Sequence, residues 1–300
     1  MAFRSYLIDE IALDCADGVF SRREAIRRLG LLGISATAAA GLLAGVADSP
    51  AAAAGDSTAP PSTDEPAGST PVEPGEEITF AGPAGDLIGV FAAANPAKGA
   101  VLVIHENRGL TEHIRSIPPR LAADGYSALA IDLLSAEGGT ASLPSEGDAT
   151  AALGEASPER LVADLRAGLD ELERRVPDAK LAAIGFCFGG GMTWQLLAAG
   201  EPRLSAAVPF YGPLPDAADF AGSPSAAVLA VYAELDDRVN GTRDAAESAL
   251  EAAGLEYEIR TFDGVDHAFF NDTGARYDAD AAAAAYDAML DWFDRYLTTP

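Results

Sequence analysis

One cysteine lies in a setting that suits covalent chemistry. Cys187 is part of the segment GFCFGGG (residues 185–191), which follows the apolar run LAAI (181–184) and precedes a helical pattern. A nucleophile between glycines at a strand-to-helix turn is held above the edge of a sheet, because a Cβ atom at the glycine positions would clash. The start of a helix also favours the thiolate over the thiol. The pattern therefore predicts a nucleophilic cysteine.

A nucleophile of this kind needs a base, and the sequence offers few. It contains three histidines, at positions 105, 113 and 267. Hydrolases with this turn carry the nucleophile, the acid and the histidine in that order along the chain. Only His267 follows Cys187, so we expect its imidazole to accept the thiol proton and later return it to the leaving group.

Three acids compete to orient this histidine. The segment ELDDRV (234–239) follows the apolar run VLAVY (228–232), so its carboxylates fall at the carboxyl end of an expected strand. Glu234, Asp236 and Asp237 are the candidates, and the D-x-x-V spacing favours Asp236. We expect Asp236 to hold the imidazole in the correct tautomer. The other two acids read as solvated loop carboxylates.

A second loop is expected to complete the site. The segment VLVIHENRG (101–109) is an apolar run that enters a glycine-containing loop, where this type of hydrolase contributes one oxyanion N–H group. The backbone amides of Asn107 and of Phe188, the residue after the nucleophile, are the predicted donors. Each donor in such a site contributes about 3 kcal/mol to transition-state stabilisation.

Four segments in this order resemble the dienelactone hydrolase family, also called carboxymethylenebutenolidase-like. They are HENRGL (105–110), GFCFGG (185–190), ELDDRV (234–239) and DHAFFN (266–271), and the resemblance spans residues 77–297. It implies an α/β-hydrolase that cleaves an ester or lactone through a Cys-His-Asp triad. It also implies that Glu106 contacts the cysteine and controls its ionisation, the alternative being a loop carboxylate paired with Arg108.

One segment departs from the family pattern. Family members that accept dienelactone hold its carboxylate with arginines, one of them shortly after the histidine, where this chain has FFND (269–272). Arg276 or Arg108 would have to take that place. We expect Arg108, Phe269 and Tyr211 to border the substrate. A general carboxylesterase and a catalytically silent binding protein of the same fold remain alternatives.

The elements that must position these residues alternate along the chain. Short apolar runs at 100–105, 127–131, 181–186, 206–211, 227–233 and 257–262 predict strands, and the patterns at 112–124, 157–176, 190–199, 241–253 and 280–297 predict helices. This alternation predicts one α/β domain over residues 77–300, with a mostly parallel, doubly wound sheet and helices on both faces.

The amino-acid composition limits the kinds of molecule that the protein is expected to bind. The chain has 46 acidic and 20 basic residues, a net charge of −26, which disfavours nucleic acid as a partner. No cluster of metal ligands and no phosphate-binding loop is evident, so we expect no metal and no organic cofactor. We expect a monomer that acts on a small ester or lactone.

The first 76 residues read as a leader and a linker. Arg22 and Arg23 precede an apolar stretch at 29–47 and the small-residue run AAAA (51–54), as in a twin-arginine export signal, so residues 1–54 predict an exported protein with no stable membrane insertion after cleavage. An uncleaved membrane anchor at 29–47 is the alternative. Residues 55–76 predict a disordered linker. Cys15 lies upstream of this signal, so a disulfide with Cys187 is not expected.

Overall fold

A single mixed sheet forms the centre of the molecule. The computed structural model describes residues 3–16, 18–47, 74–216 and 218–298, within which the sheet has eight strands in the order β1-β2-β4-β3-β5-β6-β7-β8. The strands are β1 Glu76–Gly82, β2 Gly85–Ala92, β3 Gly99–Ile104, β4 Tyr126–Asp132, β5 Leu181–Phe186, β6 Leu204–Phe210, β7 Ala227–Ala233 and β8 Tyr257–Phe262. The pairs β1–β2 and β2–β4 are antiparallel, and all later pairs are parallel.

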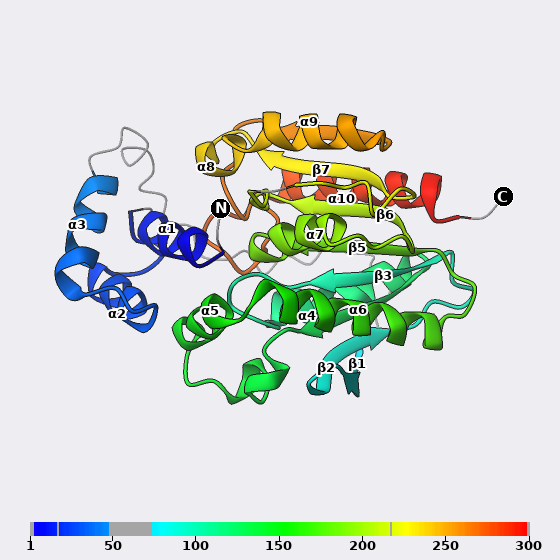
Figure 1. Ribbon diagram of the computed structural model, residues 1–300, viewed down its shortest axis with the longest axis horizontal. Coiled ribbons are helices and arrows are strands. Elements are labelled where there is room, and N and C mark those ends of the chain that lie inside the picture. Colours follow the sequence, from blue (N-terminus) through cyan, green and yellow to red (C-terminus); the bar gives the residue numbers. More distant parts are fainter. Residues whose placement is uncertain (1–2, 17, 48–73, 217, 299–300) are drawn as a thin grey trace.

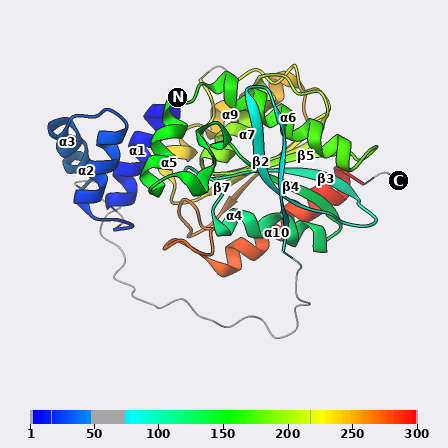
Figure 2. The ribbon, with the colours of Figure 1, turned by 90° about the horizontal axis from the view of Figure 1, so that it is seen from below.

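Helices cover both faces of this sheet. They are α4 Glu112–Ala123, α5 Glu146–Glu155, α6 Pro158–Arg175, α7 Phe188–Ala198, the short α8 Asp237–Asn240, α9 Arg243–Ala253 and α10 Ala279–Tyr296. Figure 2 shows α4 and α10 on one face and α6, α7 and α9 on the other. The fold class predicted from the sequence, a doubly wound α/β-hydrolase sheet, is confirmed.

Local sequence explains why these elements form. Strands β3, β4, β5 and β7 are buried along their whole length, as expected for parallel strands covered on both sides. Helix α6 is capped by Ser157, whose side chain accepts a hydrogen bond from the Arg160 amide, and it has a proline in its first turn. Its leucine stripe at 161, 165, 169 and 172 is fully buried. The buried strands and the helix that packs on them hold the strand ends in place, and the loops of the site begin at these ends.

Three further helices precede the sheet. They are α1 Phe3–Ala16, α2 Arg22–Leu31 and α3 Ala36–Ala47, which lie together at one end of the molecule (Figure 1). Both α1 and α2 pack against α5. Tyr6, Leu7 and Ile11 of α1 are almost completely buried. The segment read from the sequence as a leader is therefore packed against the catalytic domain in this structure.

The rest of the leader prediction concerns other residues. The expected cleavage run at 51–54 and the linker up to residue 73 lie outside the described residues, and β1 begins at Glu76. In the part of the chain that the structure describes, no helix is long and apolar enough to cross a membrane. The stretch 29–47, the alternative anchor, is divided between the end of α2 and the twelve residues of α3.

Candidate active site

The cysteine lies at a sharp turn between a strand and a helix. Cys187 follows β5 directly and precedes α7, with φ 56° and ψ −117°, a backbone conformation that costs about 1–3 kcal/mol and is concentrated at functional sites. The turn requires glycine on both sides. A Cβ atom on Gly185 would lie 2.0 Å from the Gly189 carbonyl oxygen, and one on Gly189 would lie 2.3 Å from the Ile104 carbonyl oxygen. The expected elbow is therefore present.

The histidine and the aspartate form a buried pair. His267, in the loop after β8, places Nδ1 2.5 Å from Oδ2 of Asp236, and both side chains are almost fully buried. The other oxygen of Asp236 accepts a hydrogen bond from the Val239 amide at 3.1 Å, because Asp236 is the N-cap of α8. Asp237 is exposed. Among the three candidate acids, the structure brings Asp236 to the histidine.

Glu106 is buried next to the cysteine and has an amide partner. Its Oε2 accepts a hydrogen bond of 2.6 Å from Nδ2 of Asn271, while Oε1 has no hydrogen-bond donor among the described residues. Arg108 turns away and lies 3.9 Å from Asp14 and 3.5 Å from Glu146. The alternative pairing of Glu106 with Arg108 is thus not what the structure contains.

The expected oxyanion donors lie on two neighbouring strand ends. Phe188 is the first residue of α7, and Asn107 lies in the loop after β3, which pairs with β5. The Asn107 carbonyl accepts a hydrogen bond from Thr150, which ties this loop to α5. The Asn107 amide itself donates to no oxygen of the described residues. Both amides are placed at the carboxyl edge of the sheet, as this chemistry requires.

A cavity of about 270 Å³ opens beside the cysteine. Its lining residues are Glu10, Asp14, Val19, Glu106, Asn107, Arg108, Cys187, His267, Ala268, Asn271, Thr273, Gly274, Ala275 and Arg276. Arg108, one of the residues expected to border the substrate, is among them. Tyr211 and Phe269 do not line this cavity. Both are buried. The Tyr211 ring lies edge-on to His267 with the ring centroids 5.1 Å apart, and the Phe269 ring packs edge-on against Tyr211.

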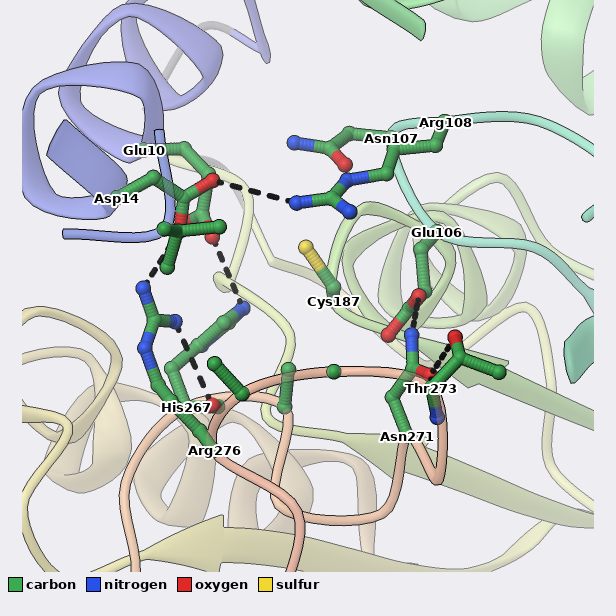
Figure 3. A pocket seen from close by; sticks show the side chains of 14 residues that line it. Glu10, Asp14, Glu106, Asn107, Arg108, Cys187, His267, Asn271, Thr273 and Arg276 are labelled. Carbon is green, nitrogen blue, oxygen red and sulfur yellow. Dashed lines mark hydrogen bonds and ion pairs between the residues drawn. The ribbon is translucent and has the colours of Figure 1, made fainter. Parts of the chain in front are cut away.

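Three residues of helix α1 reach the same site, and sequence reasoning did not find them. The hydroxyl of Tyr6 lies 3.3 Å from Sγ of Cys187. Oε1 of Glu10 lies 3.4 Å from Nε2 of His267 (Figure 3). Asp14 accepts a hydrogen bond from Arg276 at 2.5 Å. The spacing of 6, 10 and 14 is the signal that was available, since it places these side chains on one face of a helix.

Burial and charge set the ionisation of the site in this state. Burial raises the pKa of the Cys187 thiol, and the Glu10 carboxylate raises it further. His267 acts to lower this pKa, but the net shift is upward, which is opposite to the thiolate expected from the sequence. Burial acts to lower the pKa of His267, but Glu10 and Asp236 hold it well above its usual value. The site therefore favours a neutral thiol and a charged imidazolium.

The other two histidines have structural partners. Nδ1 of His105 lies 2.6 Å from the Glu106 carbonyl oxygen, and its Nε2 accepts a hydrogen bond from the Leu133 amide. Nδ1 of His113 lies 2.7 Å from Asp272. Both rings are buried. These contacts use the two histidines to fix loops around the site.

One group of side chains has the atom types of a metal site. Glu10, Cys187 and His267 each offer one ligand atom, and these atoms lie within 4.8 Å of one another. Glu10 is, however, already bound by the guanidinium of Arg238. Because that cation neutralises the carboxylate, the group suits hydrogen bonding and ion pairing better than a divalent cation.

The fold and this geometry define a hydrolase of the α/β-hydrolase class. Residues 88–297 match the profile of the Dienelactone hydrolase family. A carboxymethylenebutenolidase homologue of Escherichia coli O157:H7 is 34% identical over 208 residues, which are 65% of this chain and 76% of that protein. One from Salmonella typhi is 33% identical over 226 residues, 70% of this chain and 83% of that protein.

Solved structures agree with the sequence relatives. A dienelactone hydrolase homologue from Klebsiella pneumoniae subsp. pneumoniae superimposes with a TM-score of 0.66 at 30% identity, covering 74% of this chain and 98% of that chain. A dienelactone-hydrolase-like promiscuous phosphotriesterase from metagenomic libraries has a TM-score of 0.62 at 28% identity, with the same coverage. The chain belongs to the dienelactone hydrolase family, whose members are carboxylic ester hydrolases, and the resemblance seen in the sequence is confirmed.

Proposed function

We propose that the protein hydrolyses a carboxylic ester or lactone through an acyl-enzyme on Cys187. The Cys187 sulfur attacks the carbonyl carbon while Nε2 of His267 accepts the thiol proton. The imidazolium then returns this proton to the leaving oxygen, and water cleaves the thioester with His267 again as base. Asp236 keeps the imidazole in the tautomer whose Nε2 can accept a proton.

The surrounding groups have supporting roles in this proposal. The amides of Phe188 and Asn107 stabilise the oxyanion of the tetrahedral intermediate. Glu106 acts on the cysteine through its charge, since a buried carboxylate near the sulfur opposes thiolate formation until substrate arrives. Asn271 fixes the position of that carboxylate by its 2.6 Å hydrogen bond.

The single observation that carries the proposal is the position of the His267–Asp236 pair. Its 2.5 Å hydrogen bond is buried, and the other side of the same imidazole lines the cavity that Cys187 also lines. A cysteine kept only for packing would have no need of the strained backbone at residue 187 or of the glycines around it. The family relationship supports the same reaction class.

The substrate within this class is a separate question. Arg108 and Arg276 line the cavity and stand in for the arginine that the chain lacks after its histidine. In this structure both contact Asp14, so a carboxylate is already bound there. A general carboxylesterase with no need for a substrate carboxylate is the second candidate, because a neutral ester needs only the nucleophile and the oxyanion amides.

Hydrolysis of two substrates by matched variants tests the proposal. We would compare p-nitrophenyl acetate with a dienelactone, using the wild-type chain, Cys187→Ala and the control Cys15→Ala, in low and high salt. The proposal predicts turnover that is lost in Cys187→Ala and kept in Cys15→Ala. The ratio of the two rates separates a lactonase from a general esterase. If the folded wild-type chain turns over neither substrate, the result would favour the alternative that the chain is a catalytically silent binding protein of the same fold.

We also propose that residues 1–54 direct export. The side chains of Arg22 and Arg23 at the start of α2 are exposed, which leaves them accessible to a receptor, while Ala25 and Leu29 on the same helix are buried. Replacing both arginines by lysine is expected to leave unprocessed protein inside the cell. Equal export of the double variant and the wild type would argue against an export signal that depends on these two arginines.

A further inference from the structure

Helix α1 makes contact with both reacting atoms of the proposed site. Tyr6 approaches the sulfur of Cys187, and Glu10 approaches Nε2 of His267, the atom that has to accept the thiol proton. Cys187 is only 3% exposed as a result of its surroundings. A substrate carbonyl has to reach the space between the sulfur and this imidazole, and side chains of α1 border that space (Figure 3).

Two arginines, one in α8 and one in the segment before α10, hold the helix in this place. Arg238, beside the catalytic acid, binds the Glu10 carboxylate and the Tyr6 carbonyl, and its guanidinium lies over the Tyr6 ring at 4.1 Å. Burial acts to raise the pKa of Glu10, but Arg238 and His267 lower it to about 2, so Glu10 is bound as an anion. Arg276 holds Asp14 at 2.5 Å. Charge-assisted pairs of this kind, out of water, are strong and directional.

Apolar packing adds a second attachment. Leu7 and Ile11 are buried on the face of α1 that turns inward, and α1 and α2 both contact α5. On α2, Arg28 lies 3.6 Å from Glu146 of α5, and Arg27 donates to Ser145 at 3.0 Å. The N-terminal helices thus have their own interface with the catalytic domain, outside the active site.

The electrostatics of the docked state work against catalysis. A base must be neutral to accept a proton, yet Glu10 and Asp236 keep His267 charged, and burial with Glu10 keeps the thiol protonated. Glu10 contributes to both effects. Removing α1 would take away this carboxylate, expose the cysteine and end the contacts of Arg238 with Glu10 and of Arg276 with Asp14.

We propose that α1 is a tethered inhibitor that imitates a bound carboxylate ligand, and that the enzyme is latent until residues 1–54 leave. Glu10 and Asp14 occupy the arginines and the base, and α1 and α2 both pack against α5. The inference rests on the proposed hydrolase function and adds its regulation. It links export to activation, because the segment expected to be cut off as a leader is the one that covers the site.

The catalytic domain has what it needs to work without this segment. The Klebsiella chain is matched over 98% of its length by 74% of this chain, and the family profile begins at residue 88. The sheet and the proposed triad all follow residue 75. Relatives of this size therefore correspond to the part of the chain that remains after release.

Release can be tested on the folded full chain. A recognition sequence for a site-specific protease is inserted between residues 55 and 73, and the purified protein is cut and freed of the N-terminal fragment by gel filtration. Two readouts are compared before and after: kcat/KM for p-nitrophenyl acetate, and the rate of Cys187 alkylation by iodoacetamide in a Cys15→Ala background. If the docked state is about 99% populated, both rise roughly 100-fold on release.

Variants of the uncut chain that neutralise carboxylates of α1 test the contacts that hold this helix. Glu10→Gln with Asp14→Asn removes both ligand-like carboxylates and is expected to raise the alkylation rate at least about tenfold. The control is Asp9→Asn, which removes a neighbouring carboxylate of the same helix. Asp9 attracts Arg238 only at longer range, whereas Glu10 forms the ion pair with Arg238, so the control should change the alkylation rate much less.

The two readouts separate this inference from the function on which it rests. A rise in alkylation without any turnover would uphold the masking of Cys187 and reject ester hydrolysis. Equal turnover and equal alkylation in cut and uncut protein would overturn the inference while leaving the hydrolase intact. Lower turnover after the cut, in a catalytic fragment that keeps its circular dichroism spectrum, would also overturn the inference. In that case α1 would contribute to the active site instead of inhibiting it.

Discussion

Replacing Asp236 by asparagine should cost most of the activity while leaving the fold in place. The two oxygens of Asp236 accept from two donors, the Val239 amide at 3.1 Å and Nδ1 of His267 at 2.5 Å. Asparagine has one acceptor and one donor group of the same shape. With its oxygen on the Val239 amide, the new NH₂ group faces Nδ1 and forces the imidazole proton onto Nε2.

With its proton on Nε2, the imidazole cannot accept the thiol proton from Cys187. The expected loss of activity is therefore that of a triad whose base is blocked. In a Ser-His-Asp triad the same exchange lowers kcat about 10⁴-fold. At 1.36 kcal/mol per factor of ten, this is about 5 kcal/mol of transition-state stabilisation. We expect a loss of about 10³- to 10⁴-fold in kcat, with KM little changed, because the substrate does not touch Asp236.

The assay is steady-state hydrolysis of p-nitrophenyl acetate by cut and uncut protein, with thermal melting as a check on folding. Asp237→Asn is the matched control, since Asp237 is the next residue and its side chain is exposed. It should retain wild-type rates within about threefold. Activity in Asp236→Asn within tenfold of the wild type, or an equal loss in Asp237→Asn, would refute the assignment of the acid.

Three other changes test separate parts of the account. Glu106→Gln removes a carboxylate that raises the pKa of the Cys187 thiol, so the pH profile of alkylation should move to lower pH; an unmoved profile would remove that role. Gly190→Ala places a Cβ atom 2.4 Å from the Phe210 carbonyl oxygen and should cost about 1–3 kcal/mol of unfolding free energy, seen as a lower melting temperature, whereas Gly45→Ala, with open space around it, should cost none. His267 has a raised pKa when folded, so its attraction to Glu10 is complete below the ordinary histidine pKa and is lost as the pH rises through the raised value. The melting-temperature difference between the full chain and Glu10→Gln should therefore shrink from neutral to alkaline pH, and a constant difference would count against the pair.

The parallel core was predictable because its signals are local. The runs at 181–186, 227–233 and 257–262 match β5, β7 and β8 residue for residue. The antiparallel hairpin of β1 and β2 was not assigned. The edge strand β1 exposes most of its residues, and Gly89 interrupts the apolar run of β2. The helix expected at 241–253 corresponds to α9 at 243–253. The short helix α8 before it, which Asp236 caps, was not assigned.

The pairing of His267 with Asp236 was predictable for a different reason, which is that chain order and residue scarcity left few choices. One histidine follows the elbow, and the D-x-x-V spacing selects Asp236, which the structure pairs with it. The contribution of α1 was not predictable in this way. Tyr6 and Glu10 lie about 180 residues before Cys187 and before a leader-like stretch, and only tertiary packing brings them to the site. Arg238 was read as part of an acid loop, because its partner carboxylate was unknown.

The central claim is that Cys187 carries the acyl group during turnover, and trapping that intermediate tests it most directly. The cut protein is mixed with p-nitrophenyl acetate, quenched in acid within the first turnover, digested and analysed by mass spectrometry. The account predicts a burst of p-nitrophenol with acetyl on the peptide that contains Cys187, and neither in Cys187→Ala. Undiminished turnover in Cys187→Ala, or acetyl located on another residue in proportion to the burst, would contradict it.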